Sequence, residues 1–190
     1  YYHCAPLEIV IMVLILLGSI IFTLHSEVWK GHIEHFFRDI EIRTLVVWLS
    51  VILVAFVATL CAAKVYDDLP TLLRRAAFTV VAAFSSTGFQ TISGNDMTTV
   101  ISSGALLIII FCMAVGGSAG STTGGIKVLR IGVLVKELVA YIKDLLAPAS
   151  ARQVVMYYHV GRRPLSHDLV RANLVVLLLY GVAFLITPIV

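Results

Sequence analysis

Two long apolar runs limit most strongly what this chain can fold into. Leu7–His25 and Leu45–Ala63 are each 19 residues long. As helices, each would reach about 28 Å, which is enough to cross the hydrocarbon core of a bilayer. Only 13% of the 190 residues are charged, about half the fraction usual in soluble domains. The sequence therefore predicts an all-α integral membrane protein.

The remaining apolar segments differ from simple membrane spans. Thr71–Phe84 would reach only about 21 Å as a helix, so it predicts a re-entrant helix that enters the membrane and stops. A polar turn, Ser85–Asp96, follows it. The next apolar segment starts near Thr98 and is broken at Gly116–Gly125, and the last one is Ala172–Val190. Helix, short helix, polar turn and helix in this order form the pore-loop arrangement of cation channels.

The basic residues predict an orientation in the membrane. Eleven of the 14 Lys and Arg residues lie in two polar regions, Ser26–Arg43 and Lys127–Arg171. Because loops rich in Lys and Arg stay in the cytoplasm, we expect both regions on the cytoplasmic side. The chain begins without Met and stops inside an apolar run at Val190. We therefore expect it to be a piece of a longer protein.

The first polar patch, FSSTGFQT, has the chemistry of a cation filter. Irregular backbone is tolerated at membrane depth only where it is buried in protein or lines a wet cavity. Gly88 lets carbonyl groups turn toward an axis, and the hydroxyls of Ser86 and Thr87 add oxygen ligands. The carbonyl end of the short helix adds partial negative charge. These residues predict a K⁺ site at Ser86, Thr87 and Gly88, and the alternative is an ordinary extracellular loop.

The second polar patch, GGSAGSTTGGIK, interrupts an apolar helix. It is not a phosphate-binding loop of the Walker type, because Ile126 separates Gly125 from Lys127. A flexible linker is the simpler alternative, but linkers rarely join two apolar helices without any charge. We therefore expect a movable constriction below the filter. Lys127 and Arg130 would lie just inward, where they would hold the loop or reach lipid phosphate.

The two patches together carry a family resemblance. STGFQT followed by AVGGSAGSTTGGIKVLR resembles the Trk/Ktr/HKT superfamily of potassium and sodium transporters, and specifically its TrkH/KtrB-type membrane subunit. The resemblance implies four consecutive helix–pore helix–helix units around one pore. Residues 1–37 would then be the last helix of the second unit with a cytoplasmic connector. Residues 38–147 would be the third unit with its broken inner helix, and residues 148–190 a linker and the first helix of the fourth unit.

The resemblance also implies roles for individual residues and for partners. Gly88 matches the filter glycine, and the carbonyl groups of Ser86, Thr87 and Phe89 would line the ion path. The gate loop would contain Gly116, Gly117, Gly120, Ser121, Thr122, Thr123, Gly124 and Gly125. The implied activity is passive uptake of K⁺, or of Na⁺, across the plasma membrane, with no catalysis and no cofactor. Implied partners are a second copy in a homodimer and a cytosolic nucleotide-binding subunit of the TrkA/KtrA type, with no nucleic acid.

Three other functions stay open at this point: a membrane-embedded ligand-binding or enzyme subunit, a sodium-selective member of the same family, and a non-conducting subunit. His32, His35 and Glu34 are close enough for a metal site, but their aromatic neighbours favour an interfacial helix. We expect Glu8 to be an ordinary solvated helix end. Four glycines within helices are expected to allow close helix packing: Gly18, Gly104, Gly132 and Gly181.

Overall fold

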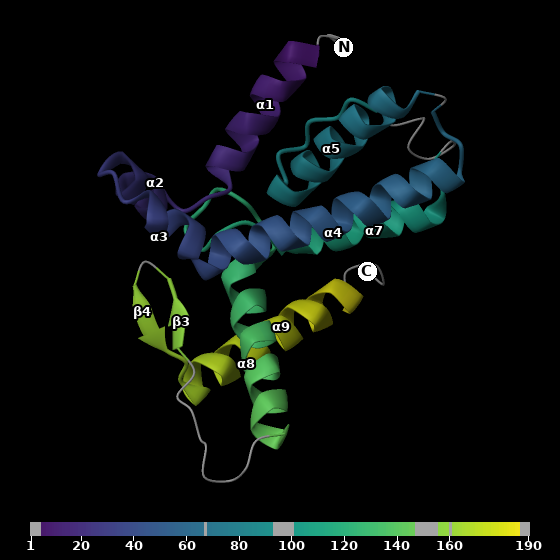
Figure 1. Ribbon diagram of the computed structural model, residues 1–190. Helices are drawn as coiled ribbons and strands as arrows, with labels where there is room; N and C mark the ends of the chain where they lie inside the picture. The colour runs from purple at the N-terminus through teal and green to yellow at the C-terminus, as the bar shows by residue number, and fades with distance from the viewer. Residues whose placement is uncertain (1–4, 67, 93–100, 147–155, 160, 187–190) are drawn as a thin grey trace. The chain divides into compact units, whose positions relative to one another are not determined.

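The computed structural model describes residues 5–66, 68–92, 101–146, 156–159 and 161–186, and within these ranges it is mainly helical, as predicted (Figure 1). Two short strand pairs accompany the helices. The chain divides into two compact units, residues 1–22 with 45–127 and residues 23–44 with 128–190. The helices are α1 (Ala5–Gly18), α2 (Phe22–Trp29), α3 (Ile33–Arg38), α4 (Ile40–Ala62), α5 (Leu69–Ser85), α7 (Ser103–Ala114), α8 (Val128–Leu146) and α9 (His167–Ile186).

Among the described residues, two helices are long and apolar enough to span a membrane, α4 and most of α9. A third span is possible if α1 and α2, which are separated by a bend, act as one. Helix α4 begins five residues before the predicted start of its apolar run. Valines on its surface, including Val46 and Val54, are exposed as expected for a lipid-facing side.

The prediction of one continuous helix over Leu7–His25 is wrong. Helix α1 ends at Gly18, and α2 begins only at Phe22. The carbonyl oxygen of Ser19 accepts a hydrogen bond from the backbone N–H of Ser118, 3.0 Å away, instead of one from the next helical turn. The break thus lies where a distant segment contacts the chain, which a local hydropathy pattern does not reveal.

The short helix predicted at Thr71–Phe84 is confirmed as α5. Pro70 lies in its first turn, where a missing N–H costs nothing. Leu72, Val80 and Phe84 are all at most 2% exposed. Helix α5 packs against both α1 and α7. It is thus a short helix with one side buried against its neighbours, while Leu69 and Leu73 are exposed.

The predicted break of the inner helix is also present. Helix α7 starts after the N-cap residue Ser102, whose hydroxyl accepts a hydrogen bond from the backbone N–H of Ala105, and it ends at Ala114. Strand β1 (Val115–Gly116) then pairs in parallel with β2 (Ile126–Lys127), and α8 follows directly. The two strands fasten the ends of the intervening loop to each other.

The region between the predicted inner helix and the last helix, expected to be a polar linker from Pro148 to Pro164, contains a hairpin. Its strands are β3 (Met156–Tyr158) and β4 (Arg162–Pro164), paired antiparallel. The start of the expected linker lies outside the described residues. Helix α9 begins at His167, five residues before the predicted Ala172, and the hydroxyl of Ser166 accepts a hydrogen bond from the N–H of Leu169.

Candidate functional site: the turn after α5 and the loop between β1 and β2

The turn that follows α5 leaves the helix through two residues with positive φ. Ser86 takes the left-handed conformation at φ 56°, and Gly88 has φ 79°. The N–H of Ser86 still donates to the carbonyl oxygens of Ala82 and Ala83. Positive φ is costly for any residue with a side chain, so glycine suits the second position.

Hydroxyl groups close the end of α5. The Ser85 hydroxyl donates to the carbonyl oxygen of Ala82 at 3.1 Å and also contacts the Thr87 hydroxyl. The following residues from Ser86 to Gln90 are exposed in this chain, and Phe89 is 54% exposed. The turn therefore presents exposed backbone and hydroxyl oxygens at the carbonyl end of a buried helix. The last residues of the predicted polar turn, 93–96, lie outside the described residues.

The loop between β1 and β2 satisfies many of its own polar groups. The backbone N–H of Gly117 donates to the Thr123 hydroxyl at 2.7 Å, and the Ser121 hydroxyl donates to the carbonyl oxygen of Ser118 at 2.7 Å. Ser121 and Thr123 also share a hydroxyl–hydroxyl hydrogen bond of 2.7 Å. Such internal pairing is what irregular backbone needs at membrane depth.

Close backbone approach explains one of the loop glycines. A Cβ atom added to Gly116 would lie 1.6 Å from the carbonyl oxygen of Gly124, so the two ends of the loop approach each other too closely for any side chain. A Cβ atom added to Gly124 would in turn lie 3.5 Å from the hydroxyl oxygen of Ser86. The two polar patches, distant in sequence, thus meet in space.

Lys127 and Arg130, the two basic residues expected beside the loop, are placed differently. The Lys127 ammonium donates to the carbonyl oxygen of Thr123, so this side chain holds the loop. Arg130 lies in the second unit, and its Nη1 atom is buried and has no hydrogen-bond partner within the described part of the chain. Of the two alternatives raised for Lys127, holding the loop agrees with this contact.

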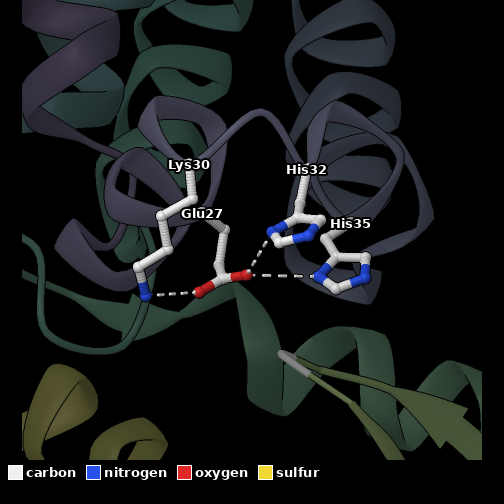
Figure 2. Close-up of polar contacts among 4 residues, drawn as sticks. All are labelled: Glu27, Lys30, His32 and His35. Atoms are coloured by element: carbon white, nitrogen blue, oxygen red, sulfur yellow. Dashed lines mark hydrogen bonds and ion pairs between the residues drawn. The ribbon is translucent and has the colours of Figure 1, made fainter.

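The histidines of the connector form a small polar cluster around Glu27 (Figure 2). One carboxylate oxygen of Glu27 lies 3.5 Å from His32 Nδ1 and 3.4 Å from His35 Nδ1, while the other accepts a hydrogen bond from Lys30 at 3.1 Å. The hydrogen bond from Lys30 lowers the pKa of the Glu27 carboxyl group. Glu34 instead lies 3.9 Å from Arg38. The carboxylate facing the histidines is therefore Glu27 and not Glu34.

Within the described residues, one other cluster has side chains of metal-binding type. Asp39, Glu41 and His159 each offer a ligand atom, and these atoms lie within 4.8 Å of one another. Both carboxylates are fully buried, and His159 Nδ1 lies 3.4 Å from Asp39 Oδ2. The backbone N–H of Glu41 also donates to Asp39 Oδ1 at 2.8 Å, and all three residues make further interactions. The cluster joins the hairpin to the start of α4 within the second unit.

The sequence profile of the TrkH family, a family of cation transport proteins, matches residues 1–188. The chain belongs to the TrkH family. The family consists of transporters and not of enzymes, which removes the enzyme alternative. The GGIK-ended broken helix that carried the resemblance lies inside the matched region.

Individual TrkH-family proteins give the same result. An uncharacterized cation transporter of Methanocaldococcus jannaschii is 34% identical over 96% of this chain. The Trk system potassium uptake protein TrkH of Halomonas elongata is 32% identical over 79% of this chain. The chain spans about a third of the length of these relatives, 35% and 30% respectively.

A solved structure supports the fold. The crystal structure of the potassium transporter TrkH from Vibrio parahaemolyticus matches with a TM-score of 0.71 at 23% identity. The match covers 84% of this chain and 34% of that one. The helical membrane fold expected from the sequence is thus confirmed.

Sequence reasoning missed two features around the site. The first is the break after Gly18, where Ser19 contacts the loop. The available signal was the pair Gly18-Ser19 inside an apolar run, although the sequence predicts that Gly18 allows close helix packing. The second is Glu8, which is 6% exposed and lies 3.4 Å from Arg74, so the expectation of a solvated helix end is wrong.

Proposed function

We propose that this chain is part of the ion-conducting membrane subunit of a potassium uptake system. The observation that carries the proposal is the meeting of the two polar patches, Ser86 on the turn and Gly124 on the loop. In a membrane protein, irregular backbone is tolerated where it is buried in protein or lines a wet cavity, and the exposed turn Ser86–Gln90 fits the second case. A potassium uptake protein among the relatives supports K⁺ as the transported ion.

In this proposal the turn after α5 is the selectivity filter. A partly dehydrated K⁺ ion would be bound by oxygens of Ser86, Thr87 and Gly88, with the carbonyl group of Phe89 next along the path. The filter assignment is supported by the buried helix that ends at the turn, because its carbonyl end favours a cation. It is supported also by the exposure of the turn, which leaves its oxygens accessible to the other units of a complete pore.

The loop Gly116–Gly125 is the proposed gate. It lies next to the proposed filter, and two short strands fasten its ends, so that its middle is the part free to move. Lys127 would hold it through the carbonyl oxygen of Thr123. Transport would then be passive, driven by the membrane potential, and controlled by displacement of the loop.

The assembly and location follow from the same proposal. We expect a plasma-membrane protein with Ser26–Arg43 and Lys127–Arg171 on the cytoplasmic side. A homodimer with a cytosolic nucleotide-binding subunit of the TrkA/KtrA type is the expected complex. The basic cytoplasmic regions are the natural docking surface for such a subunit, or for anionic lipid.

Substitution of Gly88 by Ser tests the filter. The complete transporter carrying this sequence would be expressed in a bacterium that lacks its own K⁺ uptake, and rubidium uptake would be measured at low external K⁺ with and without Na⁺. We expect G88S to reduce the preference for Rb⁺ over Na⁺. The left-handed conformation alone would cost the side chain about 1–2 kcal/mol, so stability needs a control.

Gly31, in the polar region Ser26–Arg43, offers a matched control. It has φ 88°, against 79° at Gly88, and a Cβ atom added at either position meets no atom of the described residues within 4 Å. Gly31→Ser therefore introduces the same backbone strain at a position that belongs to neither the proposed filter nor the proposed gate. Equal ion preference in wild type, G31S and G88S would remove the filter from the proposal. If the wild-type protein takes up neither Rb⁺ nor Na⁺, the proposed transport function itself is wrong.

A further inference from the structure

We infer that the break between α1 and α2 is the docking site of the gate loop. Thr122 is a positioning residue that keeps the closed loop against this break. The inference rests on the proposed function, because it assumes that the loop is a gate. It assigns a new role to Gly18–Ile21, which the sequence placed in an uninterrupted helix.

Direct contacts join the break to the loop across about 100 positions of sequence. The Ser118 N–H donates to the carbonyl oxygen of Ser19 at 3.0 Å, and the Thr122 hydroxyl donates to the carbonyl oxygen of Gly18 at 3.3 Å. Both Ser19 and Ser118 are fully buried. The first bond uses backbone atoms only, while the second depends on one side chain.

The break is built to offer these carbonyl groups. In a continuous helix, the carbonyl oxygens of Gly18 and Ser19 would accept hydrogen bonds from the N–H groups four residues later. Because α1 ends at Gly18, such carbonyl groups need other partners. Ser19 itself is anchored to the last turn of α1, since its hydroxyl donates to the carbonyl oxygen of Ile15 at 2.9 Å. The loop supplies the two missing donors.

The loop also lies against the break with almost no free space. A Cβ atom added to Gly117 would lie 2.6 Å from the carbonyl oxygen of Ser19 and 2.7 Å from the Thr123 hydroxyl. On the other side of the contact, Ile21 lies 3.5 Å from a Cβ atom added to Gly120. Outward movement of the loop must therefore break both hydrogen bonds and separate these surfaces.

One face of the loop meets the proposed filter, and another meets the break. Gly124 lies next to Ser86, while Gly117, Ser118 and Thr122 face residues 18–21. The loop stays in place as long as both its contact with Ser86 and its contact with residues 18–21 last. Weakening the contact with the break should therefore favour the displaced loop without changing the filter.

Thr122→Val in the complete transporter tests the inference. Valine has nearly the shape of threonine but no hydroxyl, so the bond to Gly18 is lost while packing is kept. One hydrogen bond contributes about 2- to 10-fold to an equilibrium of this kind. We expect T122V to raise rubidium flux by about that factor, with unchanged preference for K⁺ over Na⁺. Thr122→Ser keeps the hydroxyl and should have wild-type flux.

Gly117→Ala should displace the loop by steric contact. Its Cβ atom meets a backbone carbonyl, which cannot rotate away, so we again expect higher flux. Gly104→Ala is the matched control in the same unit, because among the described residues its Cβ atom would meet only the Ser102 hydroxyl oxygen, at 4.0 Å. Each variant is compared at equal amounts in the membrane.

A reversible crosslink gives a readout that loss of stability alone would not produce. A Cβ atom at Gly18 would lie 3.7 Å from the Thr122 hydroxyl oxygen, so Cys side chains at both positions would be neighbours that an oxidant or a short thiol crosslinker can join. Oxidation of Gly18→Cys/Thr122→Cys should lower flux, and reduction should restore it. Each single Cys variant should not respond.

A deletion within Gly116–Gly125 tests the proposal that the loop is a gate separately from the inference that it docks at the break. The deletion could raise flux while T122V, G117A and oxidation of the double Cys variant leave flux unchanged. In that case the inference that the loop docks at the break is wrong, and the proposal that the loop is a gate stands. If the deletion also leaves flux unchanged, the gate itself is wrong. Reduced flux in T122V at normal expression would overturn the inference as well, since the bond would then favour the open loop.

Discussion

The ion pair between Glu8 and Arg74 joins α1 to the short helix α5. Glu8 Oε2 lies 3.4 Å from Arg74 Nε, and the side chains are 8% and 30% exposed respectively. Because α5 precedes the proposed filter, this contact fixes the position of the helix that presents the turn. We predict that removing the positive charge by Arg74→Met destabilises the protein strongly, while the long apolar side chain preserves the packing.

The structure sets the size of the expected effect. Two unit charges 3.4 Å apart interact by about 5 kcal/mol at an effective dielectric constant of about 20. Removing one partner of a buried pair typically costs about 3–5 kcal/mol, because the other charge stays buried. Replacing both partners by neutral side chains is often close to neutral. We therefore expect a loss of about 3–4 kcal/mol for R74M and about 1 kcal/mol for Glu8→Gln/Arg74→Met.

Arg75 provides a control one residue away. Its guanidinium donates to the Tyr66 hydroxyl at 3.2 Å and lies 5.0 Å from the centre of that ring, with no carboxylate partner among the described residues. Arg75→Met should cost about 1 kcal/mol. The free energy of unfolding would be measured by SDS titration in mixed micelles. Equal losses in R74M and R75M, or no rescue by Glu8→Gln, would refute a buried pair that holds α5.

Two further predictions concern the second unit. A Cβ atom at Gly132 would lie 2.5 Å from the Thr44 hydroxyl oxygen, so Gly132→Ala should cost about 1–3 kcal/mol in the same unfolding titration. Thr44→Ala should relieve that loss, and Gly181→Ala, which meets no atom within 4 Å, should cost nothing. The hydrogen bond from Lys30 lowers the pKa of Glu27 below the ordinary value of a glutamate, so the stabilisation by this carboxylate is complete above the ordinary value and is lost as pH falls through the lowered pKa. Amide exchange protection of α2 and α3, corrected for intrinsic rates, should fall in that acidic range in wild type but not in Glu27→Gln.

Apolar length and glycine content were enough to predict the elements that form the candidate site. Helix α5 was predicted within two residues at its start, because a run too short to cross the bilayer is visible in the sequence. The break of the inner helix was predicted because ten residues from Gly116 to Gly125 lack any large apolar side chain. Both features are properties of a single continuous segment.

Features that depend on contacts between segments were not predictable. Helix α1 ends at Gly18, next to Ser19, which bonds to a residue 99 positions later, while the hydropathy of the run continues across the break. The expected role of helix glycines in packing is met at Gly132, which approaches Thr44, but Gly104 and Gly181 have free space within the described residues. A glycine alone therefore does not say which helix face has a neighbour.

In the structure, the hydroxyl groups of the two polar patches have roles that differ from those suggested by the sequence. In sequence, Ser and Thr residues suggest oxygen ligands for an ion. In the loop, however, the hydroxyls of Ser121 and Thr123 bond to the loop itself, and in the turn the Thr87 hydroxyl contacts that of Ser85. Hydroxyl groups at membrane depth are first needed to satisfy local backbone and each other. We therefore expect ion preference to depend more on the backbone conformation at Gly88 than on the Thr87 hydroxyl.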